Sequence, residues 1–211
     1  MKTNCLCAIT AACLLSGCSI LSMVGLGPLP AVKVGQYCMS VAGTNRAVKA
    51  PVRVAVQQVD GRAPYQRDKI RFSASPYTQD FYQNAVWAQN PCDMLSAEFL
   101  AYFSRKFQYA TPLPRVNRTP VDTVIVAYID AFDQICRDGQ WQAHARIKYE
   151  LLTADGSALL AASWFERTVP LASSTLDEYV AAQNTSLAEL CAEIDRAIIT
   201  NVKPAPVPAQ P

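Results

Sequence analysis

The residues "WQAHARIKYELL", 141–152, carry the clearest structural pattern in the chain, because apolar and polar side chains alternate along their whole length. One face holds the apolar set, Trp141, Ala143, Ala145, Ile147, Tyr149 and Leu151. The opposite face holds the polar set, Gln142, His144, Arg146, Lys148 and Glu150. A period of two over this length is typical of a β-strand that packs one face on a core and leaves the other in water.

The flanking segments predict further strands. "TADGS" at 153–157 contains Asp155-Gly156, a favoured hairpin turn, and leads into a return strand, "ALLAASWFERTV" at 158–169. "VDTVIVAYIDAF" at 121–132 is apolar on both alternations, which favours a central strand, and "RDG" at 137–139 is typical of a turn. Earlier in the chain, "VRVAVQQV" at 52–59 and "KIRFS" at 69–73 alternate in the same way.

Two segments show the periodicity of amphipathic helices. In "NPCDMLSAEFLAYFSRKF", Asn90 is a favoured N-cap, Pro91 suits the first helical position, and an apolar stripe follows at Leu95, Phe99, Phe103 and Phe107. The last helix is expected to begin near Ser174 or Thr175 and to turn inward Val180, Leu187, Cys191, Ile194 and Ile198. We therefore predict an α+β domain in which two amphipathic helices cover one face of a mostly antiparallel sheet.

The start of the chain resembles a bacterial lipoprotein signal. An uncharged, mostly apolar run at residues 5–15 is too short to span a bilayer, which takes roughly 20 residues, but has the length of a signal-peptide core. It ends in "LSGC" at 15–18, which is similar to the lipobox, in which a thiol such as that of Cys18 is alkylated with diacylglycerol. The alternative is a chance cysteine behind a plain signal peptide. Ser19, where inner-membrane lipoproteins usually carry Asp, implies the outer membrane, facing the periplasm.

Four parts of the chain follow from this interpretation. Residues 1–17 are the expected signal peptide, and 18–34 a lipidated tether rich in Gly, Pro and apolar residues. Residues 35–202 form the α+β domain, and 203–211, with four prolines, a disordered tail.

The cysteines left after processing predict disulfide bonds. Once Cys18 is lipidated, an even number remains in an oxidising compartment: Cys38, Cys92, Cys136 and Cys191. Cys92 and Cys191 both fall on apolar helix faces, so our hypothesis pairs them with each other and pairs Cys38 with Cys136. Four buried free thiols are the alternative. A metal site is disfavoured, because no C-x-x-C pair occurs and His144 is the only histidine.

No catalytic, cofactor or metal site is expected. Lysine and arginine total 19 against 17 acidic residues, which favours no nucleic-acid partner, and neither a Gly-rich phosphate loop nor HExxH occurs. His144 is interpreted as a polar position on an exposed sheet face and not as the base of a Ser-His-Asp triad. Asp130 and Asp133, three apart on a strand, are expected to point to opposite faces as solvated carboxylates.

An aromatic segment before the first helix is a candidate partner surface. Tyr77, Phe81, Tyr82 and Trp87 crowd this region, and tyrosine and tryptophan are favoured at interfaces. The alternative is that these side chains close the edge of the core.

The order of motifs resembles the ABC-type transport auxiliary lipoprotein family, of the kind of paraquat-inducible lipoprotein C. After the lipobox come "YCM" at 37, "VRVAVQQV" at 52, "VWAQNP" at 86, "VIVAYIDAF" at 124, "LLTADGSAL" at 151 and "EYVAAQN" at 178. The resemblance implies a non-enzymatic docking subunit of Gram-negative intermembrane lipid transport. Its implied partners are an MCE-domain conduit protein, a permease and an ATPase, and a homo-oligomer is compatible with it. Only Cys18 is carried over as a functional residue.

Two other functions stay open on the sequence. One is a structural lipoprotein of envelope or outer-membrane assembly without a transport role, which the absence of neighbouring MCE-domain, permease and ATPase genes would favour. The other is a periplasmic hydrolase, which loss of function in a His144→Ala variant would favour.

Overall fold

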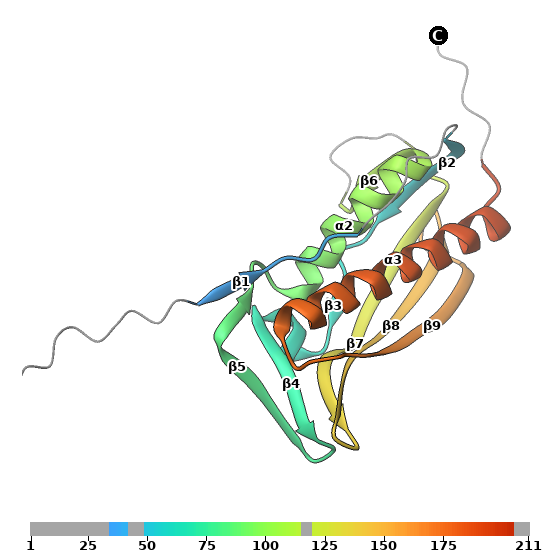
Figure 1. Cartoon of the computed structure of the whole chain (residues 1–211). Helices are drawn as coiled ribbons and strands as arrows, with labels where there is room; N and C mark the ends of the chain where they lie inside the picture. Colours follow the sequence, from blue (N-terminus) through green and yellow to red (C-terminus); the bar gives the residue numbers. More distant parts are fainter. Residues whose placement is uncertain (1–33, 42–48, 115–119, 205–211) are drawn as a thin grey trace, which may run out of the picture. The chain divides into compact units, whose positions relative to one another are not determined.

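The computed structural model describes residues 34–41, 49–114 and 120–204 (Figure 1). The predicted signal peptide, the lipidation site Cys18, nearly all of the tether and the end of the Pro-rich tail lie outside these residues. The elements before the first helix are β1 (Gly35–Tyr37), β2 (Ala50–Val56), β3 (Asp60–Gly61), the 3₁₀ turn η1 (Ala63–Gln66), β4 (Lys69–Ser75) and β5 (Thr78–Trp87). They are followed by α2 (Pro91–Lys106), β6 (Phe107–Pro112), β7 (Thr123–Arg137), β8 (Gln140–Thr153), β9 (Leu159–Pro170) and α3 (Leu176–Asn201).

The sheet is mixed, so the expectation of a mostly antiparallel sheet is wrong in this detail. Its centre is β7, which pairs antiparallel with β8 on one side. On the other side, β2, β3 and β4 pair with successive segments of β7, and all three run parallel to it. They run parallel because they are consecutive pieces of one chain segment that travels beside β7. The β1–β5 and β2–β6 pairs are also parallel, and β4–β5 and β8–β9 are antiparallel.

Both helices lie on the same face of the sheet, as predicted (Figure 1). The apolar stripe predicted for the first helix is fully buried: Leu95, Phe99 and Phe103 on α2, and Phe107, which is the first residue of β6, are each 0% exposed. The inward residues of α3 are buried with them in one core cluster. Burying one such side chain contributes roughly 1.5–3 kcal/mol, so these two stripes attach the helices to the sheet.

The strand β8 and its two turns are as predicted. Its odd-numbered residues from Ala143 to Leu151 are buried against the helices. The turn before it places Asp138 at φ +50° and Gly139 at φ +76°, and the turn after it places Gly156 at φ +74°. Two successive positive φ angles give the mirror-image turn whose twist matches that of a two-stranded ribbon.

A β-bulge in β7 changes which alternate residues of the strand face the core. Ile129 pairs with Ile147 and Ala131 pairs with Arg146, so Asp130 is one residue more than the partner strand requires. The extra residue reverses the alternation, and the buried face continues from Ile129 to Phe132.

Candidate functional site

The sheet face opposite the helices contains a polar cleft, at a gap beside β7. β3 ends at Gly61 and β4 begins at Lys69, with η1 between them. Residues 130–133 of β7 therefore have β8 on one side and no strand on the other. The amide of Arg62 closes the rim by donating to the carbonyl of Ile129 at 3.1 Å. The result is a cleft of about 380 Å³ that is lined mainly by β4, β7 and β8, by η1 and the residue preceding it, and by single residues of β5 and β9.

The bulge at Asp130 turns two carboxylates into this cleft. Because it reverses the alternation of β7, Asp130 and Asp133 line the same pocket. The expectation that they point to opposite faces is therefore wrong. A strict period of two predicted opposite faces, and one inserted residue is enough to overturn that prediction.

Asp130 holds two arginines at the outer side of the cleft. Its Oδ1 lies 2.6 Å from Nη2 of Arg62, and its Oδ2 lies 3.4 Å from Nη1 of Arg146. Arg146 also reaches Glu166 on β9, at 3.8 Å, and its guanidinium stacks over Trp164, 4.6 Å from the ring centre. This rim is partly open to water, so its ion pairs contribute little to stability.

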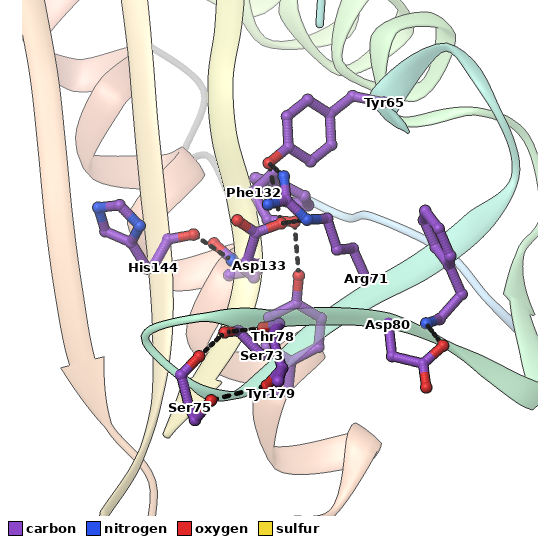
Figure 2. Close-up of polar contacts among 12 residues, drawn as sticks. Tyr65, Arg71, Ser73, Ser75, Thr78, Asp80, Phe132, Asp133, His144 and Tyr179 are labelled. Carbon is purple, nitrogen blue, oxygen red and sulfur yellow. Dashed lines mark hydrogen bonds and ion pairs between the residues drawn. The ribbon is translucent and has the colours of Figure 1, made fainter. Parts of the chain in front are cut away.

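Asp133 lies deeper and is not a solvated carboxylate as expected, since the residue is 7% exposed. The hydroxyl of Tyr65 donates to its Oδ1 at 2.8 Å, and Arg71 donates from Nη1 to the same hydroxyl at 2.7 Å. Nε of Arg71 lies 3.6 Å from Oδ1. Figure 2 shows Tyr65 and Arg71 around Asp133 and, below them, the hydroxyl of Tyr179, which donates to the backbone carbonyl of Phe132. Burial raises the pKa of Asp133, although Arg71 and Tyr65 oppose that shift.

His144 is opposite Asp133 on the neighbouring strand (Figure 2). Its side chain is 14% exposed, so it is more buried than the predicted position on a wet face. Its Nε2 lies 3.1 Å from Oε1 of Glu166, and its backbone carbonyl accepts from Gln183 at 3.1 Å. Ser73 and Ser75 line the same cleft, but their hydroxyls contact carbonyls and Thr78. Among the described residues, no serine hydroxyl bonds His144 as a nucleophile would.

The structure separates the four aromatic residues that were predicted as a partner surface. Tyr77 is 96% exposed at the tip of the β4–β5 hairpin, whereas Trp87 is 2% exposed. The Trp87 ring packs against Phe132 at 5.8 Å and belongs to the core. Tyr82 is partly buried on the same strand and donates to Gln134, and Phe81 is also partly buried. Trp87 and Tyr82 therefore fit the alternative interpretation, in which these side chains close the edge of the core. Of the four residues, only Tyr77 is almost fully exposed.

The four cysteines are free thiols in this structure. Cys92 and Cys191 are buried on the inward faces of α2 and α3, as predicted, Cys136 is partly buried and Cys38 is exposed. The pairing of Cys92 with Cys191 and of Cys38 with Cys136 therefore stays a prediction. Burial raises the pKa of Cys92 to about 11 and that of Cys191 still further.

Sequence reasoning missed Arg62, Tyr65 and Arg71, which complete the cleft. No local sequence pattern identifies these residues. Arg62 and Tyr65 lie at the short turn η1 and Arg71 lies on β4, about sixty residues or more before Asp133. The one available signal was the presence of Asp130 and Asp133 inside an otherwise apolar strand, since a buried carboxylate requires a partner. The described part of the chain contains no group of three or more metal-ligating side chains placed to hold an ion. None of its helices is both long and apolar enough to cross a bilayer.

Comparison with known proteins places this chain in a family. Residues 39–195 match the family described as ABC-type transport auxiliary lipoprotein component. The chain belongs to this family, as its motif order indicated. No curated protein matches the sequence.

Two solved structures share the fold at low sequence identity. Protein XCC0632 from Xanthomonas campestris, of the family DUF330, is 18% identical with a TM-score of 0.67, over 76% of this chain and 92% of that one. An uncharacterised protein is 16% identical with a TM-score of 0.63, over 79% of this chain and 99% of that one. These likenesses support the α+β fold alone.

Proposed function

We propose that this protein is a non-enzymatic docking subunit of an ABC/MCE-type intermembrane lipid transport system, anchored in the outer membrane and facing the periplasm. The match of residues 39–195 to a transport auxiliary lipoprotein family carries the proposal. The partners proposed are an MCE-domain conduit protein with the permease and ATPase of the same system.

The anchor is proposed at Cys18. One acyl chain binds a membrane reversibly, and each buried CH₂ adds about 0.8 kcal/mol, so a diacylglyceryl thioether with an acylated amino group holds the protein stably. Ser19 in place of Asp supports sorting to the outer membrane. The residues up to about 34 then provide reach between the membrane and the domain.

The helix-free face is the proposed contact surface. It presents Trp164, 47% exposed, with the guanidinium of Arg146 stacked on it. Tryptophan and arginine are enriched among residues that dominate interface energies.

Site-specific photocrosslinking in intact cells tests the docking role. A benzoylphenylalanine replaces Trp164 on β9 in one variant and Ile199 on α3 in a matched variant, since the two residues are 47% and 49% exposed. Crosslinks from position 164 to the MCE-domain protein, absent from position 199, are expected. Crosslinks from position 164 to outer-membrane assembly proteins alone would favour the structural lipoprotein instead.

Metabolic labelling tests the anchor separately. Wild-type chain is expected to incorporate radioactive palmitate and to fractionate with the outer membrane. A Cys18→Ser variant lacks the thiol that is alkylated, so it should take up no label. Equal labelling of this variant would contradict lipidation at residue 18.

A further inference from the structure

The polar cleft holds more positive than negative groups. Four arginines line it, Arg62, Arg71, Arg137 and Arg146, against three carboxylates, Asp130, Asp133 and Glu166. Asp130 is shared between Arg62 and Arg146, so one carboxylate serves two cations.

Two of these arginines have donors to spare. The side chain of Arg71 is 10% exposed; its Nε pairs with Asp133 at 3.6 Å and its Nη1 donates to Tyr65, which leaves Nη2 without an acceptor among the described residues. A buried guanidinium N–H without an acceptor is costly, so a site of this kind gains free energy when a ligand supplies one. Arg137 is exposed at the end of β7 and forms no ion pair within the described ranges.

The origin of these arginines on different elements favours a tetrahedral anion over a planar one. Arg62 precedes η1, Arg71 comes from β4 and Arg137 from the end of β7, so three guanidinium groups line one space from three elements. A carboxylate is satisfied by a single guanidinium fork, whereas a phosphate accepts from several N–H groups around it. The cleft, at about 380 Å³, also leaves room for the remainder of a phosphate ester.

We propose that this cleft binds the phosphate group of a phosphate ester, with Arg71 at its floor and Arg137 at its rim. Glu166 and Asp130, on the same lining, are placed to accept from hydroxyl or ammonium groups of the ester. The inference stands apart from the docking role, because it needs no partner protein.

Calorimetric titration of the full chain, purified in a nonionic detergent, tests the site. The probes are inorganic phosphate, glycerol 3-phosphate, and the water-soluble diesters glycerophosphoglycerol and glycerophosphoethanolamine. Saturable one-to-one binding is expected. Tighter binding of the diesters assigns a lipid headgroup as the ligand, and tighter binding of the monoester or of inorganic phosphate assigns a soluble phosphate. Absence of saturable binding for all four at millimolar concentration overturns the proposal.

Three variants locate the binding. Arg137→Ala is expected to weaken the affinity about tenfold, the loss of one charge-assisted contact, without affecting folding, since Arg137 is exposed. Arg71→Gln should weaken it at least as much. Arg67→Ala is the matched control. Arg67 follows η1 directly and is exposed, but it does not line the cleft. Equal affinity in Arg137→Ala and wild type would place any bound anion elsewhere.

Discussion

At Gly61 the sheet leaves no room for a side chain. A Cβ built there would lie 3.0 Å from Sγ of Cys92, 3.1 Å from Cβ of Ile129 and 3.2 Å from its carbonyl oxygen. The residue is the last of β3, so it holds β3 against both β7 and the start of α2. Glycine is needed here for close packing, and not for an unusual backbone conformation.

Gly61→Ala is expected to destabilise the domain by about 1–3 kcal/mol, the usual cost of overpacking. Urea denaturation measures the change. Gly35→Ala is the matched control, because its nearest neighbour is a Tyr37 ring carbon at 3.4 Å, an ordinary contact, and it should be close to neutral. Adding Cys92→Ala to Gly61→Ala should recover part of the loss. Equal stability of the Gly61 and Gly35 variants would contradict the steric account.

The raised pKa of Tyr149 predicts that the domain loses stability at alkaline pH. Burial, and then the hydrogen bond and charge of Glu193, raise its pKa from 10.0 to about 12. The unfolded chain therefore loses this proton at lower pH than the folded chain does. The contribution of Tyr149 is complete below pH 10 and is lost as the pH rises toward 12.

Tyr149→Phe should show a shallower decline in stability over that range than wild type, measured by urea midpoints at successive pH values. At neutral pH the variant is expected to lose about 1 kcal/mol with the bond to Glu193, which is 3.0 Å long. Glu193→Gln removes the charge and should lower the pKa of the phenol. An unchanged alkaline decline in Tyr149→Phe would assign the effect to other groups.

The two helices begin in different ways, although the sequence offers a capping residue at both. Oδ1 of Asn90 accepts from the amide of Asp93 at 2.9 Å at the start of α2. Thr175 is the N-cap of α3 but makes no such bond. Glu178 instead accepts from the amides of Ala172 and Ser173, the second at 2.7 Å. These bonds close the loop from β9 into α3.

This difference predicts unequal costs of removing the caps. Asn90→Ala is expected to destabilise the domain by about 1 kcal/mol, the usual cost of losing an N-cap bond. Thr175→Ala should cost clearly less, because no side-chain cap bond is lost. Thermal unfolding of the two variants beside wild type makes the comparison. Equal losses would mean that Thr175 caps α3 in solution.

At the scale of the elements, periodicity was a reliable guide to burial. The stripe Leu95 to Phe107 and the alternation of β8 lie where they were predicted, because burial of one face follows from the residues of that element alone. The bulge in β7 was not predictable in this way. Where both alternations are apolar, a single extra residue leaves no mark in the pattern.

At the scale of the whole molecule, the reactivity of the cysteine thiols tests the packing of α3 on α2. In the reduced folded chain, Cys38 is expected to react first with iodoacetamide, and Cys92 and Cys191 last, because burial raises both of their pKa values and thiolate is the reactive form. Peptide mapping over a time course gives the order. Reaction of Cys191 as fast as Cys38 would contradict the packing of α3 on α2.

The disulfide hypothesis needs a separate measurement on chain that has never been reduced. After unfolding without reductant, bridges between Cys92 and Cys191 and between Cys38 and Cys136 would leave all four thiols unlabelled. Uptake of label at all four positions would rule out both bridges.

The amino-acid sequence was enough to predict the fold class, both helices, the turns at Asp138-Gly139 and Asp155-Gly156, and the family. Each of these rests on a local pattern or on the order of several such patterns. The patterns did not predict whether each strand pairs parallel or antiparallel with β7, because that direction depends on the route that the chain takes between the strands. They did not predict the cleft either. Arg71 meets Asp133 only after β4 has been laid beside β7, and a contact between residues so distant in sequence exists only in the folded chain.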